Sequence, residues 1–199
     1  MKSVVVFDLG KVLVDFDYSI AARKIAARSS MSLDDINRYI GTSDITVKYE
    51  LGQVTRREFF EQAQQVIGFS GSFEEFGKFF ADIFVEIPPM IAWQAELRRR
   101  GFPTYIFSNT NDLAVEHIHR NFPFFKNFDG YIYSYEIGAM KPDARIYEAL
   151  ERLAGRRGAE IVYLDDRPEN IVGGEARGWQ AILHETPEKS RAAVEKLGL

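Results

Sequence analysis

The stretch Val4-Val5-Val6-Phe7-Asp8-Leu9-Gly10-Lys11-Val12-Leu13 decides the fold, because it carries an apolar run that ends on an acid. Consecutive apolar residues rich in β-branched side chains are typical of a short strand buried on both faces. In open α/β sheets, ligands bind at the edge where such strands end. Asp8 is therefore either a simple strand terminator or a functional carboxylate, and the rest of the chain decides between these interpretations.

The bulk composition is that of an ordinary globular domain. The chain has 199 residues, 46% hydrophobic and 27% charged, which is enough to bury a sizeable core. Its net charge of −4 gives no electrostatic basis for binding nucleic acid or an anionic membrane, so we expect neither as a partner. The lack of cysteine excludes disulfides, zinc–thiolate sites and a thiol nucleophile. No apolar stretch is long enough for a signal peptide or a membrane span, which predicts a cytoplasmic protein.

The signals that follow the first strand are helical, with no strand pattern among them. We interpret residues 15–18 as a hinge in which Asp17 caps the first helix. A hydroxyl residue three positions before a carboxylate, the capping-box pattern or its aspartate variant, recurs at Ser32 with Asp35, Thr55 with Glu58 and Ser72 with Glu75. Such a block is too long for an ordinary connection. The sequence therefore predicts an all-helical subdomain of residues 16–86 inserted in a core of residues 1–15 and 87–199.

Beyond this block, strands and helices alternate. The predicted strands cover Thr104–Phe107, Tyr131–Ser134, Ile161–Leu164 and Ala181–Leu183, and amphipathic helical segments separate them. Repeated strand–helix units indicate a parallel sheet with right-handed crossovers. The expected fold is α/β, a doubly wound, Rossmann-like parallel sheet with an inserted helical subdomain.

Polar residues follow three of the apolar strands directly. Asp8 follows the first, Ser108-Asn109-Thr110 follows the second, and Asp165-Asp166 follows the strand IVYL. Because parallel strands share one carboxyl edge, these side chains can meet although they are far apart in the sequence. Lys141, which precedes a proline and a helix, completes the set.

This set of residue types points to phosphoryl chemistry. Clustered carboxylates repel one another unless a hard cation neutralises them, and carboxylate, carbonyl and water oxygens are the ligands of Mg²⁺. A magnesium ion, a lysine and a hydroxyl suit a phosphoryl group, whose transfer depends mainly on positioning and charge neutralisation. Asp8 could itself attack phosphorus, as carboxylates do in aspartyl-phosphate enzymes.

Four segments, FDLGKVLVD, SNT, KPD and DDRPEN, resemble in order the four motifs of the haloacid dehalogenase-like (HAD) hydrolase superfamily. The helical block resembles the small cap that this superfamily inserts after its first motif. Within the superfamily, the residues of these motifs are most similar to those of small-cap phosphatases that act on sugar phosphates, including alpha-glucose-1-phosphate phosphatase-like proteins.

The resemblance implies a role for each matched catalytic position. Asp8 would be the nucleophile that becomes phosphorylated, and Ser108 and Asn109 would donate hydrogen bonds to the phosphate. Lys141 would bind the phosphate and orient Asp8.

The resemblance also implies a Mg²⁺ site. Asp8, the carbonyl of Gly10 and Asp166 would be its ligands. Asp165 and Asn170 would supply a second ligand or support the others, and the choice of Asp166 over Asp165 as main ligand stays open.

Gly10 departs from the superfamily pattern. Most phosphatases of this superfamily carry there a second aspartate that acts as general acid and base. Such help is worth ~10²–10⁴-fold in rate, so its loss matters most for a poor leaving group. Either the substrate has a good leaving group, such as an anomeric phosphate, or water or a nearby side chain such as Asp15 supplies the proton.

Four residues of the helical block either reach over the site or lie on a solvated face, namely Tyr18, Tyr49, Glu50 and Arg56.

We therefore expect a magnesium-dependent phosphatase, a monomer or homodimer, that hydrolyses a small phosphorylated metabolite through a phosphoaspartate on Asp8. Two alternatives stay open because Gly10 lacks the acid. One is a metal-independent dehalogenase-like hydrolase, against which Asp165 and Asp166 argue. The other is a catalytically weak module that binds a phosphorylated ligand. The residues do not name the physiological substrate.

Overall fold

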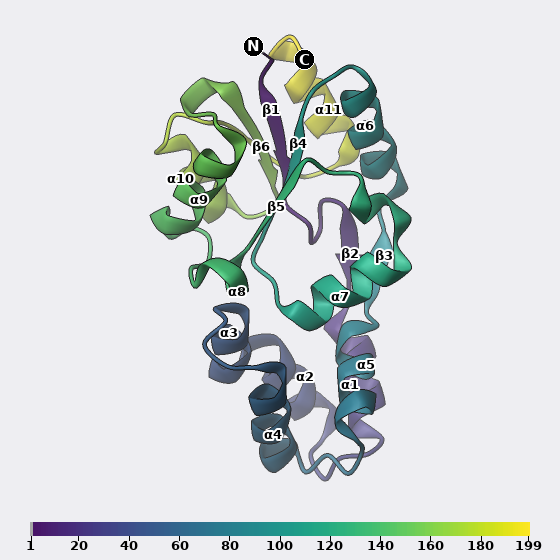
Figure 1. Cartoon of the computed structure of the whole chain (residues 1–199). Coiled ribbons are helices and arrows are strands. Elements are labelled where there is room, and N and C mark those ends of the chain that lie inside the picture. The colour runs from purple at the N-terminus through teal and green to yellow at the C-terminus, as the bar shows by residue number, and fades with distance from the viewer. Residues whose placement is uncertain (1) are drawn as a thin grey trace.

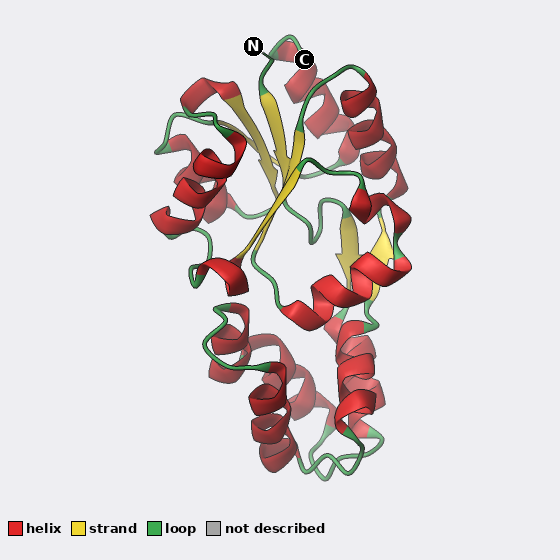
Figure 2. Ribbon diagram, in the orientation of Figure 1, coloured by secondary structure: helices red, strands yellow, loops and turns green. Residues whose placement is uncertain are grey.

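The computed structural model describes residues 2–199, except for the side chain of Thr42, and its centre is a five-stranded parallel sheet (Figures 1 and 2). The strand order is β5-β4-β1-β6-β7, with every neighbouring pair parallel. The strands are β1 (Val4–Phe7), β4 (Thr104–Ser108), β5 (Gly130–Tyr133), β6 (Ile161–Asp165) and β7 (Gln180–Leu183). Each predicted strand is therefore present, with its ends shifted by a residue at most. The predicted doubly wound sheet is confirmed.

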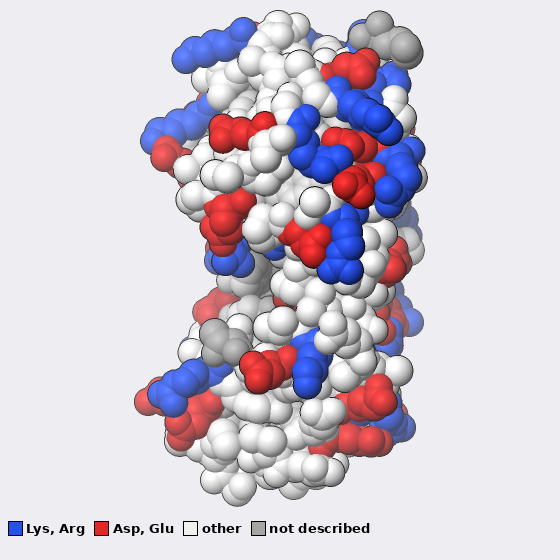
Figure 3. All heavy atoms as spheres, turned by 90° about the vertical axis from the view of Figure 1, so that its left-hand side faces the viewer, with Lys and Arg blue, Asp and Glu red and all other residues white. Residues whose placement is uncertain are grey.

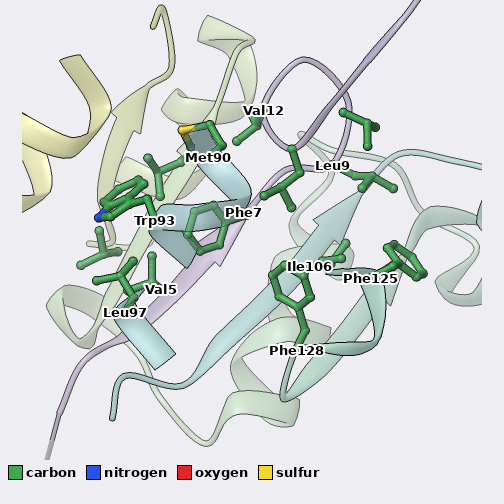
Figure 4. Close-up of a cluster of buried hydrophobic side chains, with 14 of the residues drawn as sticks. Val5, Phe7, Leu9, Val12, Met90, Trp93, Leu97, Ile106, Phe125 and Phe128 are labelled. Carbon is green, nitrogen blue, oxygen red and sulfur yellow. The ribbon is translucent and has the colours of Figure 1, made fainter. Parts of the chain in front are cut away.

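Helices cover both faces of the sheet, as the alternation of side chains along β1 requires. Val5 and Phe7 belong to one apolar cluster and Val4 and Val6 to another. The first cluster includes Trp93 and Leu97 of helix α6 (Figure 4). The covering helices are α6 (Pro88–Arg99), α7 (Asp112–Asn121) and α11 (Pro187–Lys196) on that face, and α9 (Ala144–Ala154) and α10 (Pro168–Glu175) on the other. The short helix α8 (Ser134–Ile137) follows β5. Two 3₁₀ turns cover Pro123–Lys126 and Gly158–Glu160.

Five helices, which we call the helical block, lie beyond the carboxyl ends of the strands (Figure 1). They are α1 (Tyr18–Ala26), α2 (Leu33–Thr42), α3 (Asp44–Glu50), α4 (Arg56–Ile67) and α5 (Phe73–Ala81). Their inner faces form a third apolar cluster, in which Phe59, Phe76 and Phe80 are buried against one another. The predicted hydroxyl caps are present at Ser32, Thr55 and Ser72. The block therefore has a core of its own, and its treatment as a separate domain of residues 16–86 stays a prediction.

Two short strands join the helical block to the core, where the sequence predicted none. Strand β2 (Val14–Phe16) pairs with β3 (Phe84–Glu86) in antiparallel register, so the expected uninterrupted helical pattern was wrong there. Residues 15 and 16 of the expected hinge lie in β2, whereas Asp17 caps α1 as predicted. Strands of this length are too short to display an alternating pattern. Contact between the rings of Phe16 and Phe84, with centroids 6.1 Å apart, supports the pairing.

Both signs of charge are mixed on the face drawn in Figure 3, and the outline narrows where the helical block meets the core. Among residues 2–199, no helix is long and apolar enough to cross a bilayer.

Candidate active site

The carboxyl ends of β1, β4 and β6 meet the helical block around a cavity of about 240 Å³. Among the residues that the core contributes are Asp8, Gly10, Ser108, Asn109, Lys141 and Asp166. The helical block contributes Tyr18 and Glu50. The site predicted at this edge of the sheet therefore lies between the two parts of the molecule.

Lys141 is the centre of the site. Its Nζ lies 3.0 Å from Oδ1 of Asp8 and 2.6 Å from Oδ2 of Asp165, and it donates a hydrogen bond of 2.8 Å to the carbonyl of Phe107. The Lys141 side chain is 1% exposed, so its charge needs these partners. One ammonium group thereby ties together β1, β4 and β6.

Both oxygens of Asp165 are already engaged by the protein. Oδ2 accepts hydrogen bonds from Lys141 and from the hydroxyl of Tyr163. Oδ1 accepts them from Nδ2 of Asn170 at 3.0 Å and from the backbone N–H of Arg167 at 2.8 Å. Asp165 is fully buried and does not line the cavity. It holds Lys141 and the loop before α10 in place.

Asp166 has the opposite character, since its carboxylate lines the cavity and is only partly buried. Carboxylate oxygens of Asp8, Asp165 and Asp166 lie within 4.8 Å of one another. This is the one group of three or more acidic or histidine side chains at such spacing in residues 2–199. Hard oxygen donors at this density fit a small divalent cation such as Mg²⁺.

Burial raises the pKa of Asp8 to about 7, with Lys141 lowering it and the charge of Asp165 raising it. For Lys141, burial lowers the pKa, but the two carboxylates outweigh it and the net pKa is raised. Burial raises the pKa of Asp166, and so does the neighbouring Asp165. A cation bound among these carboxylates would favour their charged forms.

The segment Ser108-Asn109-Thr110 is shaped by its own hydrogen bonds. Asn109 donates from Nδ2 to the carbonyl of Lys141 at 3.1 Å and accepts at Oδ1 from the Lys141 N–H at 2.8 Å. Asn109 therefore clamps the backbone of Lys141, and one amide hydrogen is left for a ligand. The hydroxyl of Ser108 donates only a long bond of 3.3 Å, to the carbonyl of Asn109.

The space beside Gly10 is taken by an aromatic ring. A Cβ atom at this position would lie 2.8 Å from Cε1 of Phe16. Nearby Asp15, considered above as a proton source, is exposed, ion-paired with Lys11 and outside the cavity lining. Its pKa is lowered by the hydrogen bond from Lys11, so the structure argues against this role for Asp15.

The helical-block residues divide into two groups. Tyr18 and Glu50 line the cavity, whereas Tyr49 donates a hydrogen bond to Asp112 of α7. Arg56 binds Asp112 and Glu116 through bonds of 2.7 and 2.8 Å. Tyr49 and Arg56 thus fasten the block to the core.

Lys11 and Arg167 also line the cavity, and sequence reasoning did not single them out. Arg167 lies within the segment DDRPEN and Lys11 directly follows Gly10, so position next to a motif was the available signal.

The chain is similar to known hydrolases over most of its length. A family model described as haloacid dehalogenase-like hydrolase matches residues 2–178. A phosphatase of Mycobacterium tuberculosis is 26% identical over 205 residues, covering 96% of this chain and 91% of that protein. The D-ribitol-5-phosphate phosphatase of Bacteroides thetaiotaomicron is 24% identical over 188 residues, covering 91% of each.

A similar fold is found among solved structures. A HAD family enzyme from Bacteroides thetaiotaomicron, in complex with magnesium and inorganic phosphate, matches with a TM-score of 0.82 and 21% identity. The match covers 93% of this chain and 95% of that one.

Replacing Lys141 tests its electrostatic role. Lys141→Met is expected to lower the free energy of unfolding by about 3–5 kcal/mol in metal-free buffer at neutral pH, because two buried carboxylates lose their cation. Urea denaturation followed by circular dichroism measures this loss. Lys126→Met, an exposed site, is the matched control. A loss below about 1 kcal/mol would contradict the assignment.

Glu50 is expected to make the free energy of unfolding depend on pH. Burial raises the pKa of Glu50 from 4.5 to about 7, with Arg167 lowering it. The folded chain therefore holds a proton that the unfolded chain releases, and this residue's contribution to stability falls as the pH rises from 4.5 to about 7.

Glu50→Gln removes this dependence. The variant is expected to be about as stable as wild type at pH 5 and more stable, by up to about 3 kcal/mol, at pH 8. Urea denaturation at both pH values measures the difference, with the exposed Glu61→Gln as control. Equal stability of Glu50→Gln and wild type at pH 8 would argue against a buried charge.

Proposed function

The chain belongs to the haloacid dehalogenase-like hydrolase family, and on this basis we propose that it is a magnesium-dependent phosphatase acting on a small phosphomonoester. The observation that carries the proposal is the contact of buried Lys141 with Asp8, beside a cavity that Asp166 also lines. A carboxylate held by a lysine next to a divalent-cation site has the components of an aspartyl-phosphate enzyme.

In this proposal, the metal site is formed by Asp8, Asp166 and the carbonyl of Gly10. Asp166 is favoured over Asp165 because it faces the cavity, while the oxygens of Asp165 are engaged by Lys141, Asn170 and the loop before α10. Magnesium bound there would neutralise charge on the phosphoryl oxygens.

Asp8 is proposed as the nucleophile. Its Oδ1 accepts hydrogen bonds from Lys141 and, at 2.7 Å, from the N–H of Leu9, so the carboxylate is oriented before substrate arrives. Attack on phosphorus forms the Asp8–phosphate bond as the ester oxygen leaves. Water then cleaves this acyl phosphate, which releases phosphate and restores Asp8. Lys141, Ser108 and Asn109 would hold the phosphoryl oxygens.

The helical block is proposed to act as a cap that encloses the rest of the substrate. It closes one side of the cavity and is fastened by Arg56 and Tyr49. The name of the D-ribitol-5-phosphate phosphatase supports a sugar or polyol phosphate as the substrate class.

The central test is hydrolysis of 4-nitrophenyl phosphate with Mg²⁺ or with a chelator. We expect turnover with Mg²⁺ only, and a loss of at least about 10³-fold in Asp8→Asn, because the variant lacks the nucleophile. The exposed Asp34→Asn is the matched control. Metal-independent hydrolysis of haloacids would instead indicate the dehalogenase alternative. Binding of phosphate esters without turnover of any would indicate the binding module.

The small volume of the cavity, about 240 Å³, predicts selectivity by size. Ribitol 5-phosphate and glucose 1-phosphate are expected to be hydrolysed at least about tenfold more efficiently than a phosphotyrosine peptide, because a peptide cannot enter without displacing the helical block. Phosphate release under initial-rate conditions measures kcat/KM for each. Preference for the peptide would contradict the proposed substrate class.

A further inference from the structure

A proton source for the leaving group is missing at position 10, where Gly10 stands. We propose that Glu50, at the end of α3 in the helical block, is the general acid that protonates the leaving oxygen and the general base for the second step. This inference rests on the proposed phosphatase function and deepens it by assigning a catalytic residue to the helical block.

The cavity supplies the first argument. Of the described residues that line it, three are carboxylic acids, Asp8, Glu50 and Asp166. Asp8 and Asp166 are taken by the nucleophile and metal roles. Glu50 is the remaining acid, and it ends α3, which lies beyond the carboxyl ends of the strands. The organic part of a phosphate ester must extend away from the strand ends when its phosphoryl group contacts Asp8.

The surroundings of Gly10 supply the second argument. Phe16 fills the space that an aspartate at position 10 would need, since a Cβ there would lie 2.8 Å from the Phe16 ring. Asp15 is bound to Lys11 outside the cavity. The core therefore presents no acid in place of the missing one within the part of the cavity wall that the structure describes.

The surroundings of Glu50 suit proton transfer. No hydrogen bond within the described residues engages its carboxyl group, which is therefore available to a ligand. Burial raises its pKa to about 7, so the group can both give and take a proton near neutral pH. Arg167 and the hydroxyl of Tyr18 face it. Among the charged groups on the neighbouring helices, Asp35 pairs with Arg38 on α2, Arg56 of α4 pairs with Asp112 of α7, and Glu136 of α8 accepts a hydrogen bond from Tyr135.

Its position is held by its neighbour. Tyr49 bonds to Asp112 of α7, and so does Arg56 just beyond the turn that follows α3. Glu50 is thereby kept over the cavity while the helical block stays docked on the core.

The proton balance closes over the two steps. As the Asp8–phosphorus bond forms and the ester bond breaks, protonated Glu50 gives its proton to the departing oxygen, releasing the alcohol. Glu50 carboxylate then takes a proton from the water that attacks phosphorus, and the bond to Asp8 breaks. The enzyme returns to its starting protonation state.

The test compares aryl phosphates with different leaving groups, in the presence of Mg²⁺. Glu50→Gln is expected to lose about 10²-fold or more in kcat/KM on phenyl phosphate, but less than about threefold on 4-nitrophenyl phosphate, whose leaving group departs without a proton. The ratio kcat/KM covers only the steps up to release of the alcohol, so the second step, which both substrates share, does not enter it. Glu61→Gln is expected to match wild type on both. A similar loss in kcat/KM on both substrates, or a raised KM with unchanged kcat, would overturn the proposal.

A second measurement needs no variant. In wild type, kcat/KM for phenyl phosphate is expected to fall above about pH 7 as Glu50 loses its proton, while kcat/KM for 4-nitrophenyl phosphate does not. Parallel pH profiles for the two substrates would overturn the role of Glu50 and leave the phosphatase proposal intact. Wild type inactive on both substrates would overturn the phosphatase proposal itself.

Discussion

The rest of the site depends on one buried cation. Lys141 joins Asp8 at the end of β1, the Phe107 carbonyl on β4 and Asp165 at the end of β6. Its backbone is held in turn by Asn109. An unpaired charge at this depth is prohibitively unfavourable, so these contacts specify one another and make the strand ends a single rigid unit. Rigidity of this kind is what catalysis by positioning requires.

The sequence was most informative where many residues repeat one signal. The strands, their parallel order and the four motifs rest on apolar runs and spacing, and both the fold and the family membership are confirmed. The same spacing predicted that Asp8, Ser108, Lys141 and Asp166 would meet, and they line one cavity. Their chemical roles remain proposals.

Three features could not be predicted in this way. Strands β2 and β3 pair although the whole helical block separates them in the sequence. A local sequence pattern contains no information on such a distant partner. The different surroundings of Asp165 and Asp166 arise because Asp165 is the last residue of β6, whereas Asp166 lies in the bend between β6 and α10. The cavity position of Glu50 depends on how the helical block docks, through Tyr49 and Arg56, onto α7.

The paired strands β2 and β3 have a consequence for how this molecule can diversify. Because Val14–Phe16 and Phe84–Glu86 lie side by side, the helical block leaves and re-enters the core at a single point. A different insert could be joined at this point without changing the order or register of the central sheet. Such an exchange would replace Glu50 together with the walls around the substrate, while Asp8 and Lys141 stayed in the core. Selectivity and proton supply would then be inherited as one module, and the covalent chemistry as another.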